Sequence, residues 1–78
     1  MKLRSKAPAL REWEGTAHVT TDSSVSPGGS PMLVIDGPNG GAIGPVEAYG
    51  YGYEILEATE EELEMLRQGG YGIPYIGR

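Results

Sequence analysis

The C-terminal third of the chain carries the feature that most constrains the fold, a change from alternating residues to helical periodicity. Thr59 followed three residues later by Glu62 matches a capping box, in which each residue satisfies a backbone N–H of the other. Leu63 and Leu66 supply an inward side, and a Gly-Gly pair follows where helices commonly end in a left-handed residue. We therefore expect one helix, near residues 60–68.

The rest of the sequence reads as short strands separated by glycine, proline and serine. Residues 22–31 form a loop by this reading, and Pro38-Asn39-Gly40 supplies a turn between two strands of a hairpin. Pro45 cannot donate to a sheet, so the second strand of the hairpin is either an edge strand or is broken there. The expected strands are residues 15–21, 32–37, 42–47 and 47–55.

These elements define an α+β fold. We expect three to four short, mostly antiparallel strands in a curved sheet or small open barrel, with the one C-terminal helix packed on it. A chain of 78 residues has a small core, and without cysteine it has neither a disulfide framework nor a thiolate metal site. His18 is the one histidine and lies on the polar side of its expected strand, where cross-strand pairing or solvation is the simplest interpretation. We expect no metal and no cofactor.

No stretch of the sequence is apolar for the roughly 20 residues that a membrane-spanning helix needs. Lys2, Arg4 and Lys6 resemble the start of a signal peptide, but Pro8 and Arg11 follow where an apolar segment should stand. The sequence thus predicts neither a transmembrane segment nor a signal peptide, and a cytoplasmic or virion-associated protein.

The charges are distributed unevenly along the chain. Residues 1–11 hold four basic residues and no acid, whereas residues 12–78 hold eleven acids against two basic residues. We interpret residues 1–11 as a basic, flexible arm and residues 12–78 as a single small domain. Nucleic acid could bind only through the arm, and the basic side chains available for phosphate are Lys2, Arg4, Lys6 and Arg11.

The segment EAYGYGYEI places tyrosine at every second position. As a strand it would put Tyr49, Tyr51 and Tyr53 on one face and leave a nearly bare glycine face for another backbone or a covering aromatic such as Trp13. Half-buried sheet face and protein interface are the two main interpretations. A base-stacking platform is the third, and the acidic body of the chain disfavours it.

Acidic residues gather on the end of this segment and on the expected helix. Glu57, Glu60, Glu61 and Glu64 form either a solvated face or a surface for a basic partner, which in its extreme form would imitate a phosphate backbone. The sequence shows no nucleophile paired with a plausible base.

We therefore expect no enzyme, but a non-catalytic protein–protein interaction module. It would be a small accessory subunit or regulator that docks through the acidic helix face and the tyrosine-rich strand onto a protein partner or a second copy. The alternatives are an accessory virion or assembly protein and an acidic, nucleic-acid-mimicking inhibitor. The predicted partner-binding residues are Tyr49, Tyr51, Tyr53, Glu57, Glu60, Glu61 and Glu64.

Overall fold

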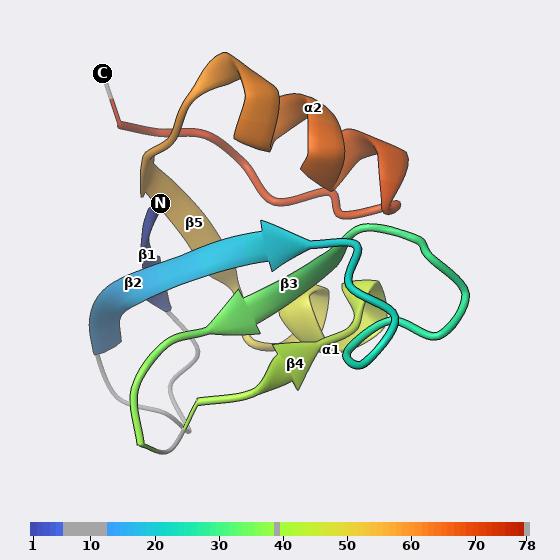
Figure 1. The fold of residues 1–78 in the computed structure, drawn as a ribbon. Coiled ribbons are helices and arrows are strands. Elements are labelled where there is room, and N and C mark those ends of the chain that lie inside the picture. Colours follow the sequence, from blue (N-terminus) through green and yellow to red (C-terminus); the bar gives the residue numbers. More distant parts are fainter. Residues whose placement is uncertain (6–12, 39, 78) are drawn as a thin grey trace.

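The computed structural model describes residues 1–5, 13–38 and 40–77. These residues form a five-stranded sheet and two helices (Figure 1). The predicted α+β class, the antiparallel curved sheet and the C-terminal helix are confirmed, but the sheet has five strands rather than three to four and there are two helices rather than one. The elements are β1 (Lys2–Ser5), β2 (Trp13–Thr20), β3 (Met32–Ile35), β4 (Ala42–Ile43), α1 (Pro45–Gly50), β5 (Tyr53–Glu57) and α2 (Glu60–Gln68).

The strands lie in the order β4-β3-β2-β1-β5, and every neighbouring pair is antiparallel. The two edge strands, β4 and β5, are consecutive among the strands and are joined by residues 44–52, which include α1. The sheet is curved like an open barrel (Figure 1), and α1 connects its two edges.

The core lies on the concave side of this sheet. Leu3, Leu33 and Ile55 are its largest fully enclosed side chains, and they come from β1, β3 and β5. Leu66 of α2 and Tyr71 from the following segment close one end, where Figure 1 shows α2 and the C-terminal segment above β2. Alternation along the strands puts the charged residues on the opposite, outer face.

The N-terminal residues differ from the prediction. Residues 2–5 of the expected flexible arm form β1, which pairs with β2 on one side and β5 on the other. Leu3 is 0% exposed, while Lys2 and Arg4 lie on the outer face and form ion pairs with Glu14 (3.9 Å) and Glu54 (2.9 Å). The alternation of inward and outward residues in β1 is not visible in the sequence, because the acidic partners of Lys2 and Arg4 lie far away along the chain. Residues 6–11 lie outside the described residues.

The Tyr-Gly segment also differs from the prediction, because it is not one strand. Pro45 occupies the first turn of α1, where its fixed φ and missing N–H favour a helix, and Oε1 of Glu47 accepts a hydrogen bond from the N–H of Gly44 (3.2 Å). The strand predicted over residues 42–47 consequently ends at Ile43. Gly52, with φ of +65°, turns the chain from α1 into β5.

Other local predictions are confirmed. The expected strands over residues 15–21 and 32–37 are observed as β2 and β3, and β3 and β4 form the predicted hairpin. In α2, Glu62 donates its backbone N–H to Oγ1 of Thr59 (3.2 Å), and Oε1 of Glu62 accepts from the N–H of Thr59 (2.8 Å). Both halves of the capping box are therefore present.

Candidate binding groove

The register of three strands brings Trp13 and Tyr53 together. Ser5 of β1 lies opposite Trp13 of β2 and opposite Tyr53 of β5, so the three side chains form one row on the concave face. Because Ser5 is small, the two rings meet over it, with centroids 6.0 Å apart and planes inclined by 66°. This is an edge-to-face contact between residues 40 positions apart in the sequence.

Tyr51 adds a third ring to this pair. It follows α1 as the C-terminal cap, and its ring lies 5.7 Å from that of Tyr53 at an interplanar angle of 65°. Its backbone carbonyl accepts a hydrogen bond from Oγ of Ser5 (2.7 Å), which ties the end of α1 to the interior strand β1. The buried residue Ser5 therefore lies between Trp13 and Tyr53 and also holds the backbone of Tyr51.

The rings form one side of a groove at the end of the open barrel. The described residues that line the groove beside the three rings and Ser5 are Ile35, Asp36, Gly37, Pro38, Gly40, Gly41 and Ile43. Its volume is about 410 Å³, which lies within the range of sites for drug-sized ligands. We refer to it below as the aromatic groove.

Glycine is required on the loop side of the aromatic groove. Gly37 has a φ of +110°, and a side chain on Gly40 would collide with the backbone carbonyl of Ile35. The loop can therefore fold back on β3, as the hydrogen bond from the N–H of Gly40 to the carbonyl of Gly37 (3.0 Å) shows. Of the described loop residues, Gly37, Gly40 and Gly41 therefore present backbone to the aromatic groove.

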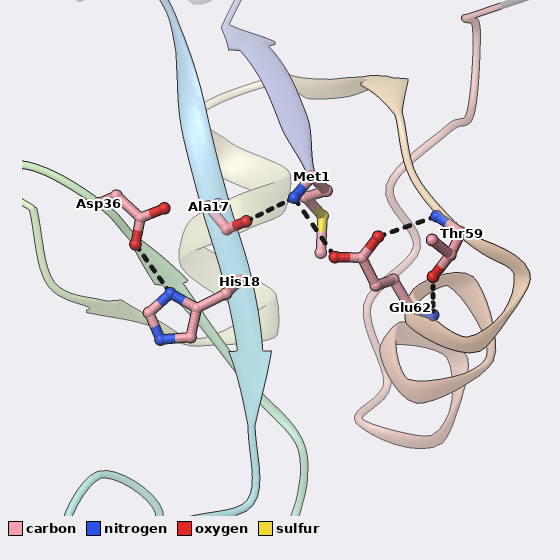
Figure 2. A network of polar contacts seen from close by, with 6 residues as sticks. All are labelled: Met1, Ala17, His18, Asp36, Thr59 and Glu62. Carbon is pink, nitrogen blue, oxygen red and sulfur yellow. Dashed lines mark hydrogen bonds and ion pairs between the residues drawn. The ribbon is translucent and has the colours of Figure 1, made fainter.

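Asp36 is the one charged residue among the described lining residues of the aromatic groove. Its carboxylate lies on the outer face of the sheet, where Oδ1 accepts a hydrogen bond from Nδ1 of His18 (2.8 Å; Figure 2). Burial, followed by the neighbouring Tyr51 and the negative charge of Glu47, raises the pKa of Tyr53. The hydroxyl group of Tyr53 therefore remains protonated to higher pH than an ordinary tyrosine.

A second, smaller hollow of about 240 Å³ lies on the other side of Tyr53. Its described lining includes Ala48 and Tyr49 of α1 and Pro74 of the C-terminal segment. Tyr49 is 87% exposed, and Val46, three residues earlier on the same helix, is 85% exposed. One face of α1 thus presents two apolar side chains that contribute nothing to the core.

The predicted tyrosine stripe is therefore divided among three environments. Tyr49 is exposed on α1, Tyr51 is half-buried in the aromatic groove, and Tyr53 is 8% exposed between the two hollows. The structure brings together Tyr51 and Tyr53 but not all three. Trp13 does not cover the glycines of the stripe, as the sequence suggests; its ring instead contacts Tyr53 and covers Gly15 of its own strand, where an added Cβ would contact the ring.

The predicted acidic residues lie apart from the aromatic groove. Glu57 ends β5, and Glu60, Glu61 and Glu64 lie exposed on α2. Glu64 pairs with Arg67 (3.0 Å), whereas the other three form no ion pair with a described residue. Their role in binding stays a prediction.

Glu62, on the same helix, has a structural role instead. Figure 2 shows its carboxylate between the cap of α2 and the amino group of Met1, which lies 3.3 Å from Oε2 and donates to the carbonyl of Ala17 (2.8 Å). Partial burial disfavours the ionised form, but hydrogen bonds from Thr59 and the amino group outweigh it, so the pKa of Glu62 is lowered. Glu62 thereby fastens α2 to β1 and β2.

The structure describes two of the four basic residues that the sequence offers for binding nucleic acid. Lys2 and Arg4 form ion pairs with Glu14 and Glu54, while Lys6 and Arg11 lie outside the described residues. Within the described ranges, no three His, Asp or Glu side chains gather as a metal site, and no helix is long and apolar enough to cross a membrane.

No family model matches the sequence, and neither a curated protein nor a solved structure shows significant similarity to the chain. The geometry of the aromatic groove and of α1 is therefore the basis for the functional argument.

Proposed function

We propose that the chain is a non-catalytic protein-interaction module that binds its partner through the aromatic groove. One observation carries this proposal: the rings of Trp13, Tyr51 and Tyr53, from two distant parts of the chain, converge on one open groove. Aromatic side chains that combine large contact area with few rotatable bonds are the usual anchors of protein interfaces.

The shape of the aromatic groove favours an extended segment as the bound element. One wall consists of rings, and the other contains Pro38 and three glycines, so that a chain in the groove could contact both ring faces and backbone. Extended and proline-rich segments bind other proteins in aromatic-lined grooves of this kind, because their ordering costs little entropy.

The exposed face of α1 extends the proposed interface. The N-cap of α1, Gly44, follows the groove residue Ile43, and its C-cap, Tyr51, lies on the opposite wall of the groove. Val46 and Tyr49 on this helix are exposed although the chain has few large apolar residues for its core. Contact with a partner would remove both from water.

The acidic helix face supports a role in the approach of a basic partner. Exposed charges add little to stability but steer encounter between oppositely charged surfaces. Replacing Glu60, Glu61 and Glu64 by glutamine should lower the association rate and weaken its dependence on salt, with little change in melting temperature. A sharp fall in melting temperature with unchanged association would assign the face a structural role.

Selection from a random peptide library displayed on phage tests the proposal. Peptides selected against the folded chain should shift the amide NMR signals of Gly37, Gly41 and Tyr51, and Tyr51→Ala should weaken their binding. Shifts confined to the outer face, such as Thr16 and Val34, would contradict it. Sedimentation at several concentrations separates a partner-binding module from the alternative of a self-assembling structural protein.

A further inference from the structure

We propose that the aromatic groove binds a proline-rich segment of the partner in the polyproline II conformation, whose backbone carbonyls accept hydrogen bonds from the side chains of Trp13, Tyr51 and Tyr53. This inference rests on the proposed function and narrows it from any extended segment to one rich in proline. It follows from three properties of the groove: its unused hydrogen-bond donors, its occupied acceptors and its lack of charge on the inner surface.

The donors supply the first argument. Nε1–H of Trp13 and the hydroxyl groups of Tyr51 and Tyr53 form no hydrogen bond within residues 1–5, 13–38 and 40–77. Tyr53 is the most informative of the three, because its side chain is only 8% exposed. Buried polar groups in proteins nearly always have a partner. An unused hydroxyl group on so buried a side chain therefore indicates a partner from outside the chain.

The hydroxyl group of Tyr53 is also accessible to such a partner. Every fully enclosed polar side-chain atom of the described residues has a hydrogen-bond partner, so the unused hydroxyl of Tyr53 is not one of the enclosed atoms. Tyr53 lines the aromatic groove together with Trp13 and Tyr51. A tryptophan N–H can only donate, and a tyrosine hydroxyl donates one hydrogen. The side chains of the aromatic wall therefore suit a ligand that offers acceptors.

The acceptors supply the second argument. On the loop wall, the carbonyl of Gly37 already accepts from the N–H of Gly40 (3.0 Å), and that of Gly41 accepts from the N–H of Ile35 (3.0 Å). A segment with many N–H groups would find these two carbonyls in use. Proline has no N–H, and a polyproline II segment has no internal hydrogen bonds, so its carbonyls are free to accept.

Charge and size supply the third argument. Asp36 is the one charged residue of the described lining, and its carboxylate lies on the outer face with His18, so the described inner surface is uncharged. A charged segment would lose its hydration there without gaining a counter-charge, whereas proline rings are apolar and lose none. A volume of about 410 Å³ has room for a few residues of such a segment.

The test starts from peptides selected from a random phage library against the whole folded chain. We expect the peptides whose NMR shifts map to the aromatic groove to be enriched in proline. Because Trp13 is the one tryptophan of the chain, its fluorescence reports binding directly. Replacing a central proline by alanine, which adds an N–H and loosens the polyproline II conformation, should weaken binding at least about threefold. N-methylalanine, which also lacks the N–H, should restore part of the affinity.

Variants of the protein test the donors. Tyr51→Phe and Tyr53→Phe keep the rings and remove the hydroxyl groups, so each should weaken binding about three- to tenfold. Neither should change the melting temperature, because neither hydroxyl has a partner among the described residues. Tyr49→Phe is the matched control, since Tyr49 is exposed on α1 and is not one of the described lining residues of the groove. It should change neither affinity nor stability.

The outcomes separate the inference from the proposed function. Groove-binding peptides without proline, or equal affinity for a peptide and its alanine variants, would overturn the inference and leave the interaction module standing. Unchanged affinity in both Tyr51→Phe and Tyr53→Phe, or a clear loss of stability in Tyr53→Phe, would also overturn it, since the hydroxyl groups would then not be the donors proposed. Failure to select any peptide that maps to the groove would count against both.

Discussion

The hydroxyl oxygen of Tyr71 accepts a hydrogen bond from the backbone N–H of Leu33 (3.0 Å). The same hydroxyl group donates to the carbonyl of Ile43, so it is inserted between β3 and β4 at the end of their short ladder. Burial raises the pKa of Tyr71, against the opposing effect of the Leu33 N–H. The segment after α2 is thereby locked to the hairpin that forms one wall of the aromatic groove.

Tyr71→Phe should destabilise the protein by about 1–3 kcal/mol, because it keeps the ring but leaves a buried N–H and a carbonyl without their partner. Chemical denaturation measures the loss, and amide hydrogen exchange should be faster at Leu33. Tyr49→Phe is the matched control, since Tyr49 is exposed. Equal stability of the two variants would contradict the proposed lock.

Truncation of the tyrosines should rank them by burial. Tyr53→Ala should cost about 3–5 kcal/mol, because it removes a buried ring that contacts both Trp13 and Tyr51. Tyr49→Ala should change stability by less than about 0.5 kcal/mol. Denaturation curves of the two variants check this order. A larger loss for Tyr49→Ala would mean that α1 packs in solution against something that shields it.

Glu62→Gln should remove a pH-dependent contribution to stability. The pKa of Glu62 is lowered from its ordinary value of 4.5, so the folded state gains stability above that pH and loses it as the pH falls through the lowered pKa. Wild type should therefore exceed the variant in unfolding free energy at pH 7, and the difference should vanish in acid. Thermal unfolding from pH 7 to pH 2 measures it.

Glu61→Gln is the control for that measurement. Glu61 shares the first turn of α2 and its dipole but lies exposed, so its removal should give a smaller difference at pH 7. If both variants follow the same pH curve, the effect belongs to the helix dipole rather than to the contacts of Glu62.

Gly15→Ala should displace the ring of Trp13, because a Cβ at this position would lie only 2.9 Å from Cη2 of that ring. We expect a red-shifted tryptophan emission and weaker binding of groove peptides. Gly28→Ala is the matched control, since nothing lies within 4 Å of its added Cβ. An unchanged emission spectrum would show that Trp13 does not cover Gly15 in solution.

The sequence predicted those elements whose signals are local. The helix at residues 60–68 was predictable because Thr59 and Glu62 reciprocate within one turn, and β3 was predictable because its apolar run is bounded by loop residues. β1 was not, because the partners of Lys2 and Arg4 are Glu14 and, 50 residues away, Glu54. The sequence alone therefore indicated an unpaired basic arm rather than a strand with ion-paired side chains on its outer face.

The aromatic groove was not predictable from local sequence signals either. It depends on the register that places Trp13 and Tyr53 on either side of Ser5, and a register of three strands follows from the whole fold. In the Tyr-Gly segment, alternation favoured a strand, but the Pro45 start and the Glu47 cap favoured a helix, and the helix forms. Alternating tyrosines alone therefore did not determine the structure.

The C-terminal segment affects how readily other chains can add to the edges of the sheet. The N–H of Ile55 donates to the carbonyl of Pro74 (2.8 Å), and the N–H groups of Ile76 and Gly77 both donate to the carbonyl of Ile55 (2.9 and 3.1 Å), so this stretch covers the free side of β5. The other edge strand, β4, has only two residues. Long unpaired edges are templates on which further chains add and form fibrils. With one edge covered and the other too short to serve, the small sheet resists growth by strand addition.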